Sequence, residues 1–91
     1  MFDTGTRRRA GGITVVSARP IGDPPAVGFV IGRSAGGAVQ RNRIRRRLRA
    51  AVERVPGFLD RDRVVIASSA VVSARFDELV EWLVVATSYD E

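Results

Sequence analysis

The 91-residue chain contains no cysteine and no histidine, and all fifteen of its basic residues are arginine. Without cysteine there is no disulfide, no thiolate metal site and no cysteine nucleophile. Without histidine there is no imidazole-based catalytic triad, no histidine-ligated zinc and no unperturbed acid–base catalyst near neutral pH. The composition therefore argues against a hydrolase that supplies its own catalytic groups.

Long apolar runs are absent as well. The N-terminal sequence MFDTGTRRRAGG lacks the apolar stretch of a signal peptide, and no run approaches the roughly 20 residues that a membrane span needs. We expect a cytoplasmic protein without a membrane partner. Its length predicts a single domain, residues 1–91, with a small core, because so short a chain buries only about 60 to 65% of its unfolded surface.

Positive charge is concentrated in two segments. The formal net charge is +5, and nine of the fifteen arginines lie in Arg7–Arg9 and Arg41–Arg49. The second segment reads RNRIRRRLR and is interrupted only by Ile44 and Leu48. Because these two apolar residues are four apart, they share one face of a helix and leave the arginines to project from the rest. Such fixed charge favours a polyanionic partner, most often a nucleic acid.

Three apolar or β-branched runs predict strands, at residues 13–18, 26–31 and 63–68. We expect the first two to form a hairpin or an adjacent pair, and the third to be central in the sheet.

Two apolar stripes at helical spacing predict helices, one from Ala38 to the stop at Pro56-Gly57 and one after Ser73, a candidate N-cap. The order of strand, strand, helix, strand and helix indicates an α+β fold. We expect a small α/β sandwich in which both helices pack on a mixed sheet of three to four strands.

A helical wheel divides the basic side chains of the first helix between two edges. One edge carries Asn42, Arg45, Arg46 and Arg49, and the other carries Arg43, Arg47 and Arg54. An asparagine among arginines can read a base edge or a 2′-hydroxyl. The preceding glycine-rich segment, residues 32–37, is either a plain turn or a loop whose N–H groups approach phosphates.

The segment from Gly28 to Arg49, GFVIGRSAGGAVQRNRIRRRLR, resembles the signature of the bacterial ribonuclease P protein subunit, typically VGFxVSKKVGxAVxRNRxKRxLR. The strand, the glycine, the Ala-Val pair and the RNR triplet are all in register. The likeness continues to the VVIA strand, to a helix opening with Ser-x-x-Phe-x-x-Leu, and back to Phe2. It therefore covers most of the chain.

The resemblance implies a protein that binds a catalytic RNA and assists removal of the 5′ leader from precursor tRNA. It implies that the RNA carries out the cleavage, that Mg²⁺ is held by RNA and substrate phosphates, and that no protein partner is obligatory. No residue of this chain is expected to be catalytic or to bind a metal alone. The RNA-binding positions implied are Arg33, Arg41, Asn42, Arg43, Arg45, Arg46 and Arg49.

The N-terminal part departs from the family pattern. Members of the family have a longer basic helix with two phenylalanines before the position of Gly5, whereas only residues 1–4 precede it here. Residues 1–12 are therefore expected to be a partly disordered remnant of that segment, produced by a misassigned start or a real truncation. A possible leader cleft keeps Phe2, Arg8 and Arg9, while Val16 stands where the first long strand often has an aromatic residue.

Two further departures reduce positive charge: Ser34 replaces a lysine, and the usual basic C-terminal extension is replaced by residues 87–91. We expect weaker binding from these changes. Alternative functions are a ribosome-associated or other structured-RNA-binding protein, a remnant that no longer folds alone, or a DNA-binding module with a basic helix.

Other polar residues have simpler interpretations. Arg7–Arg9 are equally consistent with an RNA contact and with a polar edge strand that blocks aggregation. Trp82 is expected to be partly buried at a helix edge, and Asp60 and Asp62 to be solvated turn residues rather than a metal pair. The remaining arginines are expected at the surface: Arg19, Arg54, Arg61, Arg63 and Arg75.

Overall fold

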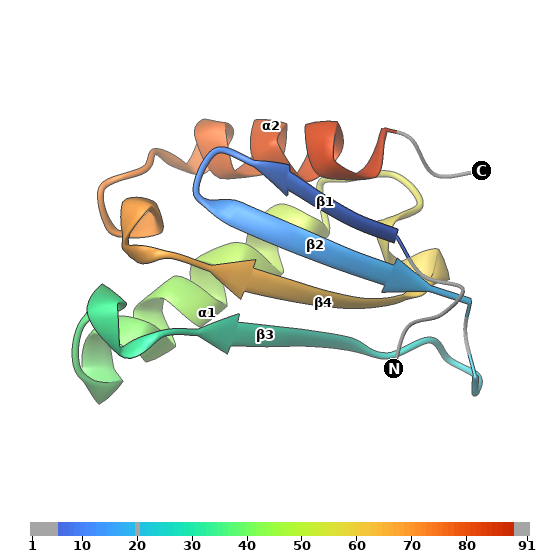
Figure 1. The fold of residues 1–91 in the computed structure, drawn as a ribbon, viewed down its shortest axis with the longest axis horizontal. Helices are drawn as coiled ribbons and strands as arrows, with labels where there is room; N and C mark the ends of the chain where they lie inside the picture. The colour runs from blue at the N-terminus through green and yellow to red at the C-terminus, as the bar shows by residue number, and fades with distance from the viewer. Residues whose placement is uncertain (1–5, 20, 89–91) are drawn as a thin grey trace.

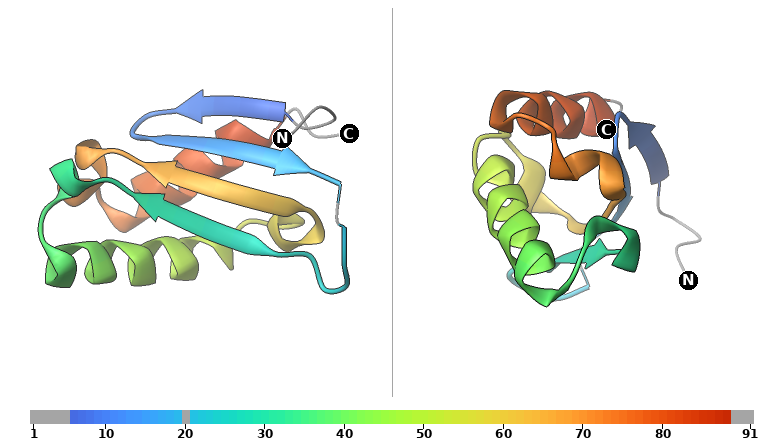
Figure 2. Two further views of the ribbon diagram at one scale, coloured as in Figure 1. Left: turned by 60° about the horizontal axis from the view of Figure 1, so that its bottom comes forward. Right: turned by 90° about the vertical axis from the view of Figure 1, so that its left-hand side faces the viewer.

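The computed structural model describes residues 6–19 and 21–88 as a four-stranded sheet with two helices on one face (Figures 1 and 2). The strands are β1 (Thr6–Ala10), β2 (Ile13–Ala18), β3 (Val27–Ile31) and β4 (Asp62–Ala67), and the helices are α1 (Ala38–Val52) and α2 (Phe76–Thr87). Three short 3-10 segments connect them: η1 (Arg33–Ala35), η2 (Phe58–Asp60) and η3 (Ser69–Val72). The predicted α+β sandwich with a mixed sheet is confirmed.

The strand order is β1-β2-β4-β3, with β3 parallel to β4 and the other neighbours antiparallel. The central position predicted for β4 is confirmed. The predicted pairing of β2 with β3 is wrong, because β4 lies between them. Parallel strands need a crossover, and α1 supplies it between β3 and β4, so β3 is left at the edge of the sheet (Figure 1).

Residues 6–10 form strand β1 instead of the partly disordered segment expected for residues 1–12. They pair with β2 from Thr6 opposite Ser17 to Ala10 opposite Ile13. The arginines of β1 are exposed at the edge of the sheet, as the edge-strand interpretation predicted. The strand is ordered because its backbone completes the antiparallel ladder with β2, which local composition alone does not reveal.

The core lies between the sheet and the two helices. Val15 of β2 and Val65 of β4 face each other in register, and both are buried under Leu48 of α1 and Leu83 of α2. Alternation along β2 and β4 sends every second side chain into this layer. The opposite face of the sheet carries no helix among residues 6–19 and 21–88 (Figure 2).

Trp82 of α2 packs against the turn that joins β1 to β2, which confirms its predicted partial burial. Gly11 in this turn has φ of 53°, and a Cβ there would lie 2.0 Å from Cε2 of the indole. A side chain at this position would face both an unfavourable left-handed backbone and a collision with the ring.

Gly11→Ala should therefore lower the free energy of unfolding by about 2 kcal/mol or more, because the left-handed backbone alone costs about 1–2 kcal/mol. Urea denaturation followed by Trp82 fluorescence measures the change. Gly22→Ala is the matched control, because a Cβ at Gly22 meets no atom within 4 Å. Equal stability of the two variants would contradict the predicted role of the Gly11–Trp82 contact.

The N-cap of α2 is Arg75, so the prediction of Ser73 is wrong. Val71 in η3 and Ala74 after it are both buried in the core, and Ser73 lies between them. The helix therefore begins only after Ala74. The Arg75 N–H donates to Glu78 Oε1 at 2.9 Å, and the Arg75 guanidinium donates to Asp77 Oδ2 at 2.8 Å. The latter bond lowers the pKa of Asp77, so its small stabilising effect is lost as the pH falls through that lowered pKa.

Candidate nucleic-acid interface

Helix α1 buries one apolar face and presents the arginines on the others. Ile44, Leu48, Ala51 and Val52 are buried against the sheet and α2. Gly36 determines how the chain enters the helix, because only glycine readily adopts its φ of 122°. A Cβ added at this position would lie 2.8 Å from Gln40 Cβ. Residues 32–37 thus form an ordered turn into α1, and their approach to phosphates stays a prediction.

Four polar side chains of α1 line a shallow cleft of about 470 Å³: Asn42, Arg45, Arg46 and Arg49. They are the same four residues that the helical wheel placed on one edge. Arg45 Nη1 donates to Asn42 Oδ1 at 2.9 Å. Asn42 therefore orients one guanidinium of the cleft, while its amide nitrogen keeps two donors for a ligand. We call these four residues the arginine cleft.

The opposite flank of α1 faces α2 and is partly structural. Arg47 Nη2 donates to the Ala74 carbonyl oxygen at 2.6 Å, and the Arg54 guanidinium lies 5.6 Å from the centroid of the Phe76 ring. Arg43 is exposed on this flank. The two basic edges predicted by the wheel are therefore distinct surfaces, of which only one forms the arginine cleft.

The other predicted RNA-binding residues lie near the N-terminal end of α1 but do not line the cleft. Arg33 is exposed on η1, and Arg41 is half-buried in the first turn of the helix. Arg33, Arg41 and Arg43 thus lie outside the cleft, and their contact with RNA stays a prediction.

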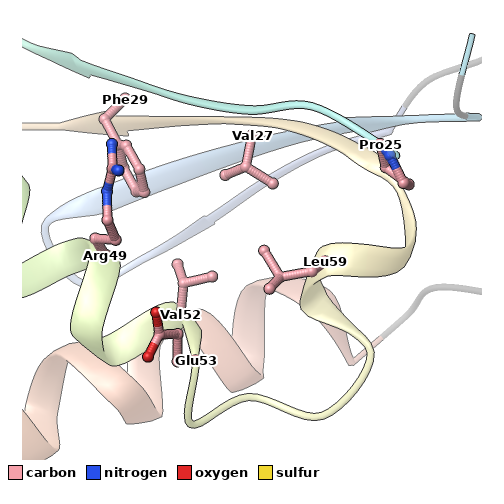
Figure 3. Close-up of a pocket in the computed structure, with 7 residues that line it drawn as sticks. All are labelled: Pro25, Val27, Phe29, Arg49, Val52, Glu53 and Leu59. Carbon is pink, nitrogen blue, oxygen red and sulfur yellow. The ribbon is translucent and has the colours of Figure 1, made fainter. Parts of the chain in front are cut away.

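At its C-terminal end the arginine cleft shares Arg49 with a second pocket of about 260 Å³, which is lined mainly by hydrophobic residues. Figure 3 shows this second pocket. Arg49 belongs to both cavities, and its guanidinium lies 5.8 Å from the centroid of the Phe29 ring on β3. The contact links the arginine face of α1 to the edge strand of the sheet.

The three arginines of β1 do not all lie on the same face of the sheet. Arg7 and Arg9 pair with Val16 and Thr14, whereas Arg8 pairs with Val15, whose side chain lies under the helices. Arg7 and Arg9 therefore share the open face, and the structure does not bring Arg8 to it. Strand pleating therefore separates Arg8 from Arg9, and their place in a leader cleft stays a prediction. Phe2 lies outside the described residues.

The sequence and the fold of this chain are both similar to those of known proteins. A family model described as Ribonuclease P matches residues 1–88. The chain belongs to the ribonuclease P protein family. It is 42% identical over 65 residues to a ribonuclease P protein component of Beutenbergia cavernae, covering 66% of this chain and 55% of the relative. A second component, from Acidothermus cellulolyticus, is 48% identical over 65 residues, covering 62% of this chain and 54% of the relative.

The chain spans about half the length of the curated ribonuclease P relatives that it matches. Its fold is that of solved members of the family. The ribonuclease P protein of Thermotoga maritima superposes with a TM-score of 0.78 at 23% identity, covering 97% of this chain and 86% of that protein. The Staphylococcus aureus protein gives a TM-score of 0.73 at 19% identity, with 92% of this chain and 79% of that protein covered.

The sequence predicts Arg63 at the surface of this ribonuclease P family member. The structure contradicts this prediction, because Arg63 is only 3% exposed. Its Nε donates to the Phe58 carbonyl at 2.6 Å, and its Nη1 donates to Ser17 Oγ at 2.7 Å. Its Nη2 donates to the Gly57 carbonyl at 3.3 Å, and the guanidinium lies 4.7 Å from the Phe58 ring centroid. The alternation of β4 contained the signal, because Arg63 is in phase with buried Val65.

Asp62 is not a solvated turn residue, which corrects the sequence-based expectation. Its carboxylate accepts from the Ala26 N–H at 2.8 Å and from the Ile21 N–H at 3.2 Å. It thus fastens the connection between β2 and β3 where this connection passes the end of β4. Asp60 is exposed. In the described part of the chain no three acidic residues are grouped to hold a metal ion, and no helix is long and apolar enough to cross a membrane.

Asp62→Ala should lower the free energy of unfolding by about 1–2 kcal/mol, because two backbone N–H groups lose a charged acceptor. Chemical denaturation measures the loss, and Asp60→Ala is the control from the same turn. If both alanine variants are equally stable, Asp62 does not fasten the connection.

Proposed function

We propose that this chain acts as the protein component of ribonuclease P, binding the catalytic RNA and assisting endonucleolytic removal of the 5′ leader from precursor tRNA. The arginine cleft is the observation that carries the proposal. It collects three guanidinium groups and a carboxamide on one flank of a helix whose apolar face is fixed in the core. Arginine forks match phosphate oxygens, and asparagine adds donors for a 2′-hydroxyl or a base.

The protein's part in this reaction is electrostatic rather than catalytic. The family resemblance implies that the cleaving groups belong to the RNA, and the absence of histidine and cysteine from the sequence accords with this. Mg²⁺ ions held by RNA and substrate phosphates supply the metal-assisted hydrolysis. The arginines offset repulsion between RNA strands, so fewer Mg²⁺ ions are needed to hold the complex together. A protein with this role acts in the cytoplasm. Its RNA partners there are the ribonuclease P RNA and the substrate, precursor tRNA.

The open face of the sheet is the part we assign to the precursor leader. Arg7 and Arg9 supply charge at its edge, while Val30, Val64 and Ile66 make its described surface apolar. Among residues 6–19 and 21–88 this face carries no aromatic side chain on β1, β2, β3 or β4. Contact with a single-stranded leader by these residues is therefore charge-dominated and insensitive to sequence.

A DNA-binding role receives no support from the arrangement of α1. A helix-turn-helix needs a second helix joined to the first by a short turn. Here α1 is flanked by strands, with β3 before it and η2 and β4 after it. Competition between structured RNA and duplex DNA for the protein tests this preference, which should favour RNA.

Reconstitution with a bacterial ribonuclease P RNA tests the proposed function. At low Mg²⁺ the protein should increase the rate of precursor tRNA cleavage, with the Thermotoga maritima protein as the positive control. No increase under conditions in which the control protein acts would exclude the role for this chain. Retained RNA binding without any increase would favour the alternative of a structured-RNA-binding protein.

A further inference from the structure

The pocket beside the arginine cleft has a composition suited to a flat, partly polar group (Figure 3). One wall is the Phe29 ring with the Arg49 guanidinium beside it. The remaining walls are aliphatic or acidic, and come from the β3 approach, the end of α1 and η2: Pro25, Val27, Val52, Glu53 and Leu59. Its volume of about 260 Å³ is below the range of about 300–1,000 Å³ that drug-sized ligands occupy, so a smaller group fits best.

The polar groups of the pocket complement the edge of a nucleobase. Arg49 donates only, and the Glu53 carboxylate accepts only. Within the described part of the chain these two side chains form no ion pair with each other, although both line the pocket. A base that offers both an acceptor and an exocyclic amine can satisfy the two side chains together, and its ring can stack beside Phe29 and Arg49.

The pocket is continuous with the proposed phosphate-binding surface. Arg49 lines the pocket and the arginine cleft, and Arg46 and Asn42 extend the cleft along α1 away from the pocket. A nucleotide whose phosphates lie along the cleft therefore has its base next to the pocket mouth. Sequence-specific RNA recognition commonly uses such unpaired bases, stacked on aromatic rings or on arginine.

We propose that this pocket receives the base of one unpaired nucleotide of the RNA that the arginine cleft binds. The proposal rests on the proposed function and goes beyond it by assigning a base-reading site. Glu53 accepts from an exocyclic amine or a ring N–H of the base, and Arg49 donates to a ring nitrogen or carbonyl. All four bases satisfy both groups, uracil through its N3–H, and N3-methyluridine loses the donor that Glu53 needs.

Leu59→Trp tests the proposal by filling the pocket from its rim. Leu59 is 50% exposed, so the change removes no core side chain, and Val85→Trp on α2 is the matched control at 48% exposure. Binding to ribonuclease P RNA should weaken about 5- to 100-fold in Leu59→Trp, as expected for one lost stacked base. The salt slope should stay unchanged because no phosphate contact is removed. Val85→Trp should bind like the wild type.

A photoreactive residue at position 59 identifies the nucleotide, with position 85 as the control. Crosslinks should fall on one unpaired nucleotide, and an abasic substitution there should reproduce the Leu59→Trp loss without adding to it. N3-methyluridine at that nucleotide should bind more weakly than unmodified uridine to the wild type, but not to Glu53→Leu. Equal binding of the two nucleotides by the wild type would overturn the assigned role of Glu53.

The outcomes separate this inference from the function on which it rests. If the wild type binds the RNA with a strong salt dependence but Leu59→Trp binds equally well, the base pocket is overturned and the proposed function stands. If the wild type does not bind the RNA, the proposed function fails with it. A change in oligomeric state of Leu59→Trp with unchanged RNA affinity would assign the pocket to a protein contact and overturn the base-reading role.

Discussion

Replacing Arg45, Arg46 and Arg49 together by glutamine should weaken binding to ribonuclease P RNA by about 100-fold or more at low salt. The slope of log affinity against log salt should become less negative by about 1.4 to 2.7, because each phosphate contact contributes about 0.7 to 0.9 and Arg49 also faces the base pocket, so two or three contacts are lost. Filter binding or fluorescence anisotropy over a series of salt concentrations measures both quantities. The effect should be large because all three guanidinium groups line one cleft and can neutralise one stretch of backbone.

The matched control removes the same charge elsewhere. Arg19, Arg54 and Arg75 are exposed and lie outside the arginine cleft. Their combined replacement by glutamine should change affinity only slightly, because the lost charges do not line the cleft and salt screens exposed charges over a Debye length of roughly 10 Å at 0.1 M. Equal losses in the two triple variants would show that net charge, and not the cleft, determines RNA binding.

Asn42 provides a finer comparison within the same cleft. Asn42→Ala removes the acceptor that holds Arg45 and also removes the two free amide donors. Affinity should fall about 2- to 10-fold, as for one hydrogen bond between neutral groups, while the salt slope stays close to that of the wild type. A slope change as large as that of a lost arginine would mean that Asn42 acts only by placing Arg45 on a phosphate.

The residues of the arginine cleft could be predicted from the sequence, because the helical period of α1 alone determines which side chains share that flank. The four-residue spacing of Ile44 and Leu48 fixes which face of α1 is buried, and the helical period then fixes where Asn42, Arg46 and Arg49 project. The pocket beside it was not accessible in this way. Phe29 and Arg49 are 20 residues apart in the sequence and meet only because α1 packs against β3.

The errors have a common physical origin in long-range pairing. The apolar and β-branched runs indicated that β2 and β3 are strands. They gave no information on strand order, so they could not show that β4 lies between β2 and β3. Asp62 looked like a turn residue because its two N–H donors, at Ile21 and Ala26, belong to a distant connection. The N-cap of α2 was misplaced for a related reason: burial of Val71 and Ala74 against the core overrides the local preference of Ser73.

The packing of β3 against α1 connects the fold to its proposed function. The Arg49–Phe29 contact orients one arginine of the cleft from the sheet side, and Asn42 orients Arg45 from within the helix. Two of the three cleft arginines are therefore held before any ligand binds. Less side-chain freedom remains to be lost on binding, which improves affinity for a given number of contacts.

The buried Arg63 should have the largest effect on stability of any single side chain considered. Arg63→Met keeps an unbranched side chain but leaves the Phe58 and Gly57 carbonyls and Ser17 Oγ without the donors that Arg63 provides. Each buried acceptor left without a donor costs about 1–3 kcal/mol, so we expect a loss of about 3 kcal/mol or more. For a domain of this size that corresponds to a fall of about 12 to 24 °C in the unfolding temperature.

Graded variants keep this prediction testable even if Arg63→Met does not fold. Arg63→Lys retains the charge but cannot reproduce the forked geometry, so it should lose less than Arg63→Met and more than Ser17→Ala. Ser17→Ala removes a single acceptor and should cost about 1 kcal/mol. Arg19→Met, at an exposed position, should be unchanged within about 0.5 kcal/mol. A Lys or Met variant as stable as the wild type would show that these hydrogen bonds only offset the cost of burying the guanidinium.

Arg63 also connects stability to the base pocket, because it holds Gly57 and Phe58 directly before Leu59 on the pocket rim. Loosening η2 should therefore affect RNA binding through the pocket and not through the arginine cleft. In Arg63→Lys, measured at a temperature where the protein stays folded, affinity should fall while the salt slope stays unchanged. A change in slope would instead mean that the displacement reaches Arg49 and the phosphate contacts, making the cleft and η2 one mechanical unit.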